Sequence, residues 1–196
     1  MATEDTSGAV TAWTIFAYDQ ADGYWLTEER HYRSRVLASG QRSPKDLDIA
    51  VILAAIHALG EGSTHTVRDP RMQSTLECLE TLFDAAYPIN WNRSAPLAPA
   101  MGRYAGDVYF SGGAYYFSTL GAAEFCFLAA ARGERASAWI SKGDAFLETV
   151  RRYTPENGEL SEQFDQRTGE QTSARHLAWS YAAFISCVAA RRAIAR

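Results

Sequence analysis

Residues 160–181 read LSEQFDQRTGEQTSARHLAWSY, a polar stretch that leads into an apolar helical pattern. A loop with Pro155, Asn157 and Gly158 precedes it, so Glu162 is expected on a loop at the start of a helix. A carboxylate among polar neighbours on such a loop can orient a water molecule or accept a proton. The alternative interpretation is a solvated surface carboxylate, which is the common state of glutamate.

A second distinctive stretch, residues 102–125, reads GRYAGDVYFSGGAYYFSTLGAAEF. It joins a Gly-containing loop to another apolar helical pattern. Core packing is a sufficient explanation of its aromatic residues without any role in binding, and these are Tyr109, Phe110, Tyr115, Tyr116 and Phe117. Residues 90–113 as a whole are rich in Pro, Gly and Asn and predict a long loop, which in a compact domain is more often functional than idle.

These two stretches, in this order and with this spacing, resemble the glucoamylase family of glycoside hydrolases. The resemblance implies that Glu162, in an SEQ(Y/F)D motif, is the general base that activates water against an α-glucosidic bond with inversion. It also implies substrate contacts for Arg103, Tyr104, Asp107, Tyr109, Tyr115 and Gln163. Tyr115 stands where the family usually has a tryptophan that stacks on the sugar, and Ser111 and Gly113 replace asparagines.

The substrate that the resemblance implies is a starch-type α-glucan or a malto-oligosaccharide. The family hydrolyses α-1,4 and α-1,6 bonds from non-reducing ends and releases β-D-glucose. An inverting glycosidase needs two carboxyl groups about 6.5–9.5 Å apart. The family's general acid lies in a tryptophan-glutamate-glutamate motif of its amino-terminal half, and the sequence does not contain that motif. Glu28 and Glu29 follow Trp25 in a different context and are expected to be solvated.

Three hypotheses follow for the activity. In the first, the chain is a glucoamylase-like hydrolase whose acid comes from a missing amino-terminal half or a second chain. In the second, it is a non-catalytic half toroid that binds sugar or serves as a helical interaction module. In the third, it is a truncated product that does not function alone and self-associates through an exposed apolar flank of the helix expected at residues 48–59.

Helical patterns that alternate with loops predict a mainly α protein with little strand. The resemblance makes this protein part of an (α/α)6 toroid with about half of the helices, and residues 1–196 a single domain similar to the carboxy-terminal half of the family's catalytic domain. Residues 24–44 are expected to be extended. The expected helices cover residues 10–18, 48–59, 69–87, 114–132, 134–153 and a last segment from 172 or 173 almost to the end.

Two of these helices carry clear start signals. Residues 48–59, DIAVILAAIHAL, are apolar nearly all round and are expected to be buried, with Asp48 capping the start and Gly60 ending the helix. Asp69 and Pro70 open the next helix in the favoured order. Its apolar residues fall on one face, namely Met72, Leu76, Leu79, Leu82 and Phe83. His57 and Trp179 are expected to lie in the core.

Composition excludes several classes of partner and cofactor. A formal charge of -4 and a pI near 5.6 argue against nucleic acid and anionic membranes. Cys78, Cys126 and Cys187 lie in apolar helical patterns without CxxC pairing and are expected to be buried free thiols. Histidine spacing gives no metal site, and no phosphate loop, GxSxG elbow or dinucleotide fingerprint occurs, so no metal or cofactor is expected. The family is commonly secreted, but no signal-like or membrane-spanning segment is found, which leaves localisation open.

Overall fold

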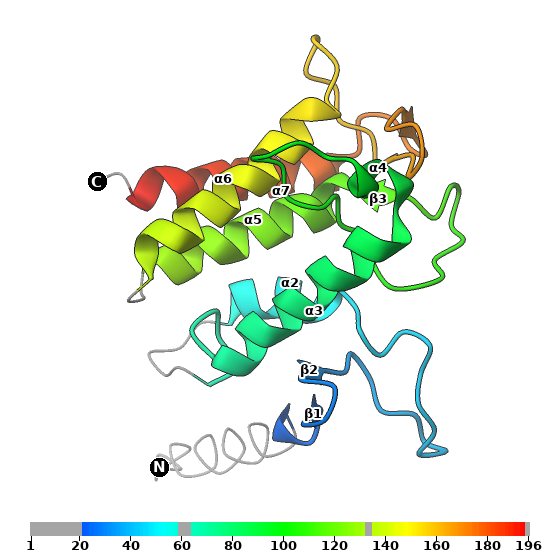
Figure 1. The fold of residues 1–196 in the computed structure, drawn as a ribbon, viewed down its shortest axis with the longest axis vertical. Helices are drawn as coiled ribbons and strands as arrows, with labels where there is room; N and C mark the ends of the chain where they lie inside the picture. Colours follow the sequence, from blue (N-terminus) through cyan, green and yellow to red (C-terminus); the bar gives the residue numbers. More distant parts are fainter. Residues whose placement is uncertain (1–20, 59–63, 132–134, 195–196) are drawn as a thin grey trace, which may run out of the picture.

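The computed structural model describes residues 21–58, 64–131 and 135–194. Six helices lie in these ranges (Figure 1), namely α2 (Ala50–His57), α3 (Pro70–Ala86), α4 (Pro88–Trp91), α5 (Tyr116–Ala130), α6 (Ala136–Arg152) and α7 (Ala178–Ile194). Five two-residue strands accompany them: β1 (Trp25–Leu26), β2 (His31–Tyr32), β3 (Ala114–Tyr115), β4 (Gln163–Phe164) and β5 (Gln171–Thr172). The prediction of a mainly α protein is confirmed, while the helix predicted at residues 10–18 lies outside the described ranges.

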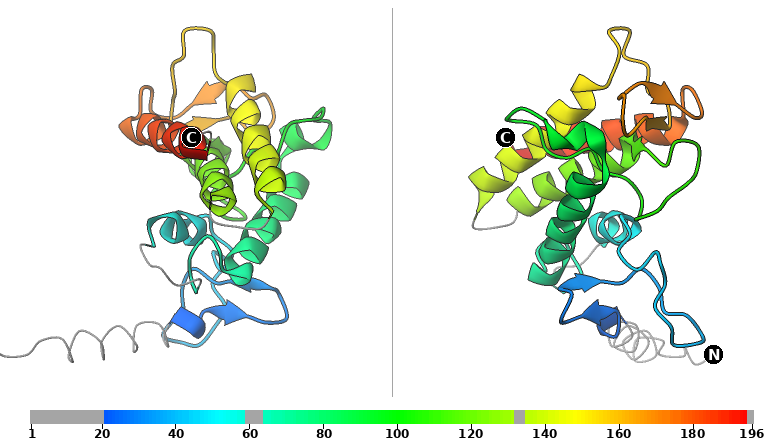
Figure 2. Two further views of the ribbon diagram at one scale, coloured as in Figure 1. Left: turned by 90° about the vertical axis from the view of Figure 1, so that its left-hand side faces the viewer. Right: turned by 45° about the vertical axis from the view of Figure 1, so that its right-hand side comes forward.

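Helix α5 is the centre of the fold. It packs against α6, α7 and α2, and the left view of Figure 2 shows it between α6 (yellow) and α7 (red), with α2 (cyan) beneath. Thirteen of its fifteen residues are buried. Gly143 of α6 faces it so closely that a Cβ there would lie 2.4 Å from Cε1 of Phe127. Glycine at this position therefore lets the two helices approach each other.

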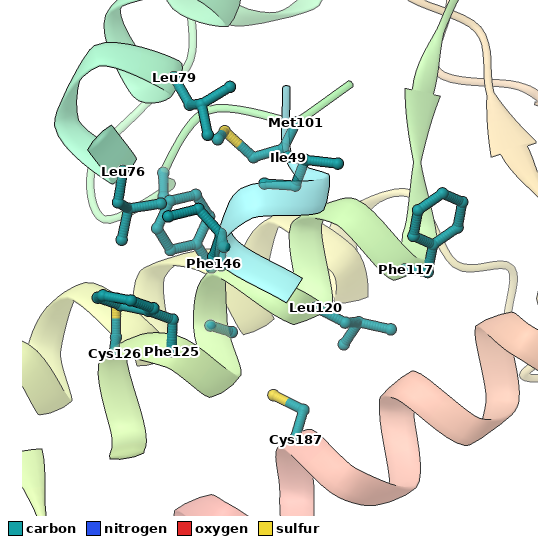
Figure 3. Close-up of a cluster of buried hydrophobic side chains, with 14 of the residues drawn as sticks. Ile49, Leu76, Leu79, Met101, Phe117, Leu120, Phe125, Cys126, Phe146 and Cys187 are labelled. Carbon is teal, nitrogen blue, oxygen red and sulfur yellow. The ribbon is translucent and has the colours of Figure 1, made fainter. Parts of the chain in front are cut away.

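The core collects side chains from every helix of eight residues or more (Figure 3). Leu79 of α3, Phe125 of α5 and Phe146 of α6 are all fully buried. The cysteines Cys126 of α5 and Cys187 of α7 are buried free thiols, as predicted, and Figure 3 shows Cys187 pointing from α7 toward α5. Burial raises the pKa of the Cys126 thiol well above its usual value, so this group behaves as a small apolar side chain. Cys78, in contrast, is only half-buried.

The predicted caps are present at the starts of α2 and α3. Oδ1 of Asp69 accepts a hydrogen bond from the N–H of Arg71 at 2.8 Å. Oδ1 of Asp48 accepts one from the N–H of Ala50 at 2.9 Å, although the N-cap residue by backbone position is Ile49. Four of the five expected apolar residues of α3 are buried, and Leu82 is partly buried. Local sequence signals therefore fixed the positions of both helix starts.

Helix α2 is not buried all round, so that prediction is wrong. Ile52 and Ala55 face the core, whereas Ala54 and His57 are exposed, and the prediction that His57 lies in the core fails with it. Helices α3 and α5 cover only one side of α2. An apolar cavity of about 410 Å³ lies along α2, between it and the β1–β2 hairpin. Gly60, the expected end of the helix, lies outside the described residues.

Helix α7 begins at Ala178, later than predicted. The residues expected to start it pair instead as β5 with β4, which also pairs with β3 in a three-stranded antiparallel sheet. Ser173 and His176 then adopt positive φ angles of 67° and 51°, which are incompatible with a right-handed helix. Similarly, α5 starts two residues late because Ala114–Tyr115 form β3. No helix within the described ranges is long and apolar enough to cross a membrane.

Candidate active site

The three-stranded sheet brings the two distinctive sequence stretches together. Tyr115 of β3 lies opposite Gln163 of β4, and Gln163 lies opposite Thr172 of β5. Glu162 directly precedes β4, where its N–H donates to the carbonyl of Ala174 at 2.8 Å and its carbonyl accepts from the N–H of Tyr116 at 3.3 Å. The backbone of the candidate base is therefore held on both sides.

The carboxylate of Glu162 is half-buried and is held by a serine. The hydroxyl of Ser173 donates a hydrogen bond to Oε2 of Glu162. Ser173 reaches it from the turn after β5, in the left-handed conformation already noted. Ser173 was expected near the start of the last helix, and its contact with Glu162 was not predicted, because only the pairing of β4 with β5 brings residues eleven positions apart face to face.

Arg103 and Asp107 form a two-pronged ion pair beside this sheet. Nε of Arg103 donates to Oδ2 of Asp107 at 2.7 Å, and Nη2 donates to Oδ1 at 2.8 Å. Asp107 also accepts hydrogen bonds from the N–H of Tyr109 and from the hydroxyl of Tyr115, both at 3.0 Å. Burial tends to raise the pKa of Asp107, but these donors outweigh it and hold that pKa below its usual range. Asp107 is therefore ionised.

Tyr115 is a support for Asp107 with no open ring face. Its side chain is 0% exposed, with the Arg103 guanidinium 4.9 Å from the ring centre and the ring of Phe117 5.2 Å away. Burial, followed by the negative charge of Asp107, raises the pKa of Tyr115 far above its usual value, and the charge of Glu162 adds to this effect. Tyr115 thus lies within electrostatic reach of Glu162, and its hydroxyl stays protonated and donates its hydrogen bond to Asp107.

The remaining predicted residues surround this ion pair. Gln163 is fully buried, and its Nε2 donates to the carbonyl of Tyr109 at 3.2 Å. The guanidinium of Arg103 lies 5.4 Å from the ring centres of both Tyr104 and Tyr109. Tyr104 is at the far side of the cluster, where Nζ of Lys45 lies 4.4 Å from its ring centre, whereas Tyr109 is on the exposed side. The structure therefore brings all seven predicted site residues into one region.

Comparison with known proteins assigns the chain to a family. A sequence model of glycosyl hydrolases family 15 matches residues 4–142 and 134–189 of the chain. The chain belongs to this family. The glucoamylase of Neurospora crassa is 31% identical over 193 residues, which cover 78% of this chain and 30% of that protein. The chain spans about a third of the length of the curated relatives it matches.

Solved structures of family 15 agree with this assignment. The glucoamylase of Hypocrea jecorina superposes with a TM-score of 0.78 at 26% identity, over 88% of this chain and 35% of that one. The glucoamylase of Saccharomycopsis fibuligera, at 20% identity, gives a TM-score of 0.81 over 95% of this chain and 49% of that one, which shows a shared fold. The described helices are therefore part of the family's (α/α)6 toroid, as predicted.

The carboxyl group at the centre of this cluster does not provide a general acid to accompany Glu162. Asp107 is ionised, so it does not serve as a general acid. Glu28 and Glu29 are exposed at the β1–β2 turn, as predicted, and Arg42 pairs with Glu29. Within the ranges that the structure describes, no group of three or more His, Cys, Asp or Glu side chains could hold a metal ion.

Trp179, at the start of α7, is a further residue that sequence analysis placed wrongly. It was predicted to lie in the core, yet its side chain is 54% exposed. One face of its ring stacks on Phe117, with centroids 4.0 Å apart and planes 8° from parallel. The apolar composition of α7 gave no means to tell its covered side from its open side, so the sequence alone could not reveal this exposure.

Proposed function

We propose that this chain provides the general-base side of a glucoamylase active site. In this proposal Glu162 activates water for hydrolysis of α-1,4 and α-1,6 glucosidic bonds at the non-reducing ends of starch-type glucans. The observation that carries the proposal is the hydrogen bond from Ser173, which anchors Oε2 of Glu162. In the described residues Oε1 has no such partner, so it is available to a water molecule.

The reaction proceeds in one displacement in this proposal. A water molecule hydrogen-bonded to Glu162 attacks the anomeric carbon while its proton moves to the carboxylate. The bond from the anomeric carbon to the glycosidic oxygen breaks, and that oxygen takes a proton from a general acid on the opposite side of the sugar. Attack on the face opposite the leaving group releases β-D-glucose.

Arg103 is proposed to bind sugar hydroxyls beside this base. Asp107 occupies Nε and Nη2 of the guanidinium, which leaves Nη1 to donate to a further acceptor. The ion pair also fixes the direction of the guanidinium, so less side-chain entropy is lost when a sugar binds. Tyr104 and Tyr109 remain proposed substrate contacts at the edges of this cluster, whereas the fully buried Gln163 and Tyr115 are proposed supports.

The general acid is proposed to come from a family-15 amino-terminal segment that packs against α7. The outward side of α7 is apolar, and the described residues leave it open. Ile185 is 68% exposed, and Ala178, Ala182 and Ala189 lie on the same exposed side. A helix that is apolar on all sides normally has a partner on each side. Such a segment would place a second carboxyl group opposite Glu162.

A non-catalytic sugar-binding or helical interaction module is the second candidate function. The observation that favours it is the two-pronged pairing of Asp107 with Arg103, because this pairing holds the carboxylate as a hydrogen-bond acceptor and not as a proton donor. In this alternative the same open side of α7 binds a helical partner, and loss of the Glu162 carboxylate has no functional effect.

The first experiment compares Glu162→Gln with Glu170→Gln, a matched change at an exposed residue of the same hairpin. Proton NMR follows the anomer released from maltotetraose, with and without the amino-terminal part of a family-15 catalytic domain. We expect β-glucose first from the wild type and from Glu170→Gln, and a 10²- to 10⁴-fold lower rate from Glu162→Gln, roughly the contribution of a positioned base.

Equal rates from the two variants, or α-glucose as the first product, would exclude Glu162 as the base of an inverting reaction. Turnover only in the presence of the added segment would support an acid supplied from that segment. Absence of turnover under both conditions would favour the non-catalytic module.

A further inference from the structure

The loop between Asp107 and Gly112 exposes an aromatic ring beside the candidate base. Phe110 is 64% exposed, whereas Tyr115, which stands where the family usually has a stacking tryptophan, is fully buried. Phe110 also has a φ of 52°, a left-handed conformation that a bulky side chain rarely adopts. An exposed apolar ring in a strained conformation, next to a candidate active site, indicates a functional constraint on that ring.

Hydrogen bonds to the backbone on both sides of Phe110 position this loop and connect it to the cluster. The N–H of Gly112 donates to the carbonyl of Tyr109 at 2.9 Å, and Nε2 of Gln163 donates to the same carbonyl at 3.2 Å. Nε2 of Gln166 donates to the carbonyl of Ser111 at 2.7 Å. The residues on both sides of Phe110 are thus tied to β4 and its turn, directly after Glu162. A loop whose backbone is already positioned loses less conformational entropy when a ligand packs on its side chains.

The rings themselves form a series from the ion pair outward. The guanidinium of Arg103 lies 5.4 Å from the ring centre of Tyr109, and the ring of Tyr109 meets that of Phe110 edge to face, with centroids 4.8 Å apart. An edge-to-face contact supports Phe110 and leaves a face of its ring open. The region therefore combines an open apolar ring with hydrogen-bond donors on its inner side. A pyranose ring matches this pattern, since it has an apolar C–H face and a rim of hydroxyl groups.

From this arrangement we infer that Phe110 is a stacking surface for a glucose ring of a malto-oligosaccharide bound at the Glu162 cluster. This inference rests on the proposed function for the identity of the sugar. It makes Phe110 a substrate-binding residue that determines how tightly a glucan is held, separate from the chemistry at Glu162.

The test measures maltotetraose binding by NMR titration, which does not require turnover. Phe110→Ala is expected to raise Kd about 3- to 10-fold, in line with the loss of one aromatic stacking contact, while Phe110→Trp keeps wild-type affinity. Trp91→Ala is the matched control, because Trp91 is an equally exposed aromatic residue on α4 at 62% exposure. It is expected to leave Kd unchanged.

Phe110→Gly separates binding from folding. Glycine adopts a positive φ without strain, so this variant is expected to unfold at the same or a higher urea concentration than the wild type while it binds maltotetraose as weakly as Phe110→Ala. A residue with only a structural role would show the opposite pattern, with lower stability and unchanged binding.

Three results would overturn the inference: unchanged Kd in Phe110→Ala, equal weakening by Trp91→Ala, or a wild-type chain that does not bind maltotetraose. Failure of the proposed function looks different, because Glu162→Gln is expected to bind maltotetraose like the wild type. If the wild type turns over maltotetraose and Phe110→Ala binds it with unchanged Kd, the stacking role of Phe110 is excluded and the proposed catalysis stands. If Phe110→Ala binds maltotetraose more weakly than the wild type and no protein shows turnover, the proposed catalysis is excluded and the stacking role stands.

Discussion

Helices α5 and α7 have similar apolar sequences and very different surroundings. Thirteen of fifteen residues are buried in α5, whereas only Ser180 and Cys187 are buried among the seventeen of α7. The left view of Figure 2 shows the reason, since α5 lies inside the helix layer and α7 lies at its edge. One side of α7 packs on α5, and Ser186 donates to Oε2 of Glu124 across this contact at 2.6 Å.

The comparison shows that an apolar helix does not always lie in the core. It can also lie at an edge of the fold, where it needs a further partner. The outward side of α7 carries Ala178, Ala182, Ile185 and Ala189, where an isolated domain would normally carry charged residues. Helix α2 repeats this arrangement on a smaller scale, with Ala54 exposed opposite the buried Ala55. Both open sides agree with a chain that forms part of a larger toroid.

The largest expected effect comes from removing the same side chain from each helix. Phe125→Ala in α5 is expected to lower the free energy of unfolding by about 3–5 kcal/mol, because it leaves a cavity at a fully buried site. Phe184→Ala in α7, at 43% exposure, is expected to cost less than about 1 kcal/mol. Urea unfolding of both variants measures the difference. Equal losses would mean that α7 is as enclosed as α5.

An intermediate effect is expected when the contact between α5 and α6 is overfilled. A Cβ at Gly143 would lie 2.4 Å from Cε1 of Phe127, whose ring is fully buried and cannot move freely. Gly143→Ala is therefore expected to cost about 1–3 kcal/mol in spite of the better helix propensity of alanine. Ala182→Leu adds volume to the open side of α7 and is expected to change stability by about 0.5 kcal/mol at most. Thermal unfolding compares the two variants, and a stability gain in Gly143→Ala would refute the tight contact.

The smallest change in stability, and the sharpest test of the open side, comes from a charge on α7. Ile185→Lys is expected to alter the free energy of unfolding by less than about 0.5 kcal/mol, because the side chain is 68% exposed. It is also expected to reduce any self-association of the chain seen in sedimentation velocity, since that side is the largest open apolar part of α7. Val36→Lys, at 48% exposure far from α7 in the sequence, is the control. A loss above about 2 kcal/mol in Ile185→Lys would show that the chain already covers this side.

Much of the fold could be predicted because its signals are local. Asp69 and Pro70 fixed the start of α3, and the spacing of Leu76, Leu79 and Phe83 identified its buried side. The start of α7 was missed because strand pairing between β4 and β5 is a contact between distant residues, and it took precedence over the capping preference of Thr172 and Ser173. The burial of α2 was overestimated for a similar reason, since apolar composition does not reveal how many neighbours a helix has.

The candidate site, like the fold, could be predicted only in part. The motifs alone named Glu162 and Arg103 as candidate residues, and the structure brings their two sequence stretches together through β3 and β4. Ser173 could not be found in advance, because its contact with Glu162 depends on a hairpin of two-residue strands that no periodicity predicts. The exposure of Phe110 and the burial of Tyr115 were equally hidden, since both are aromatic residues of the same loop region.

The sequence by itself determined the family and the helical class, and it supplied the residues proposed for the site. Those properties depend on residue identity and on spacing within one helix or one motif. Only the tertiary structure decided which apolar sides are covered, which oxygen of Glu162 is anchored and which aromatic ring faces solvent. These outcomes depend on the pairing of β3, β4 and β5 and on the place of each helix in the layer, and both arise from contacts between residues far apart in the chain.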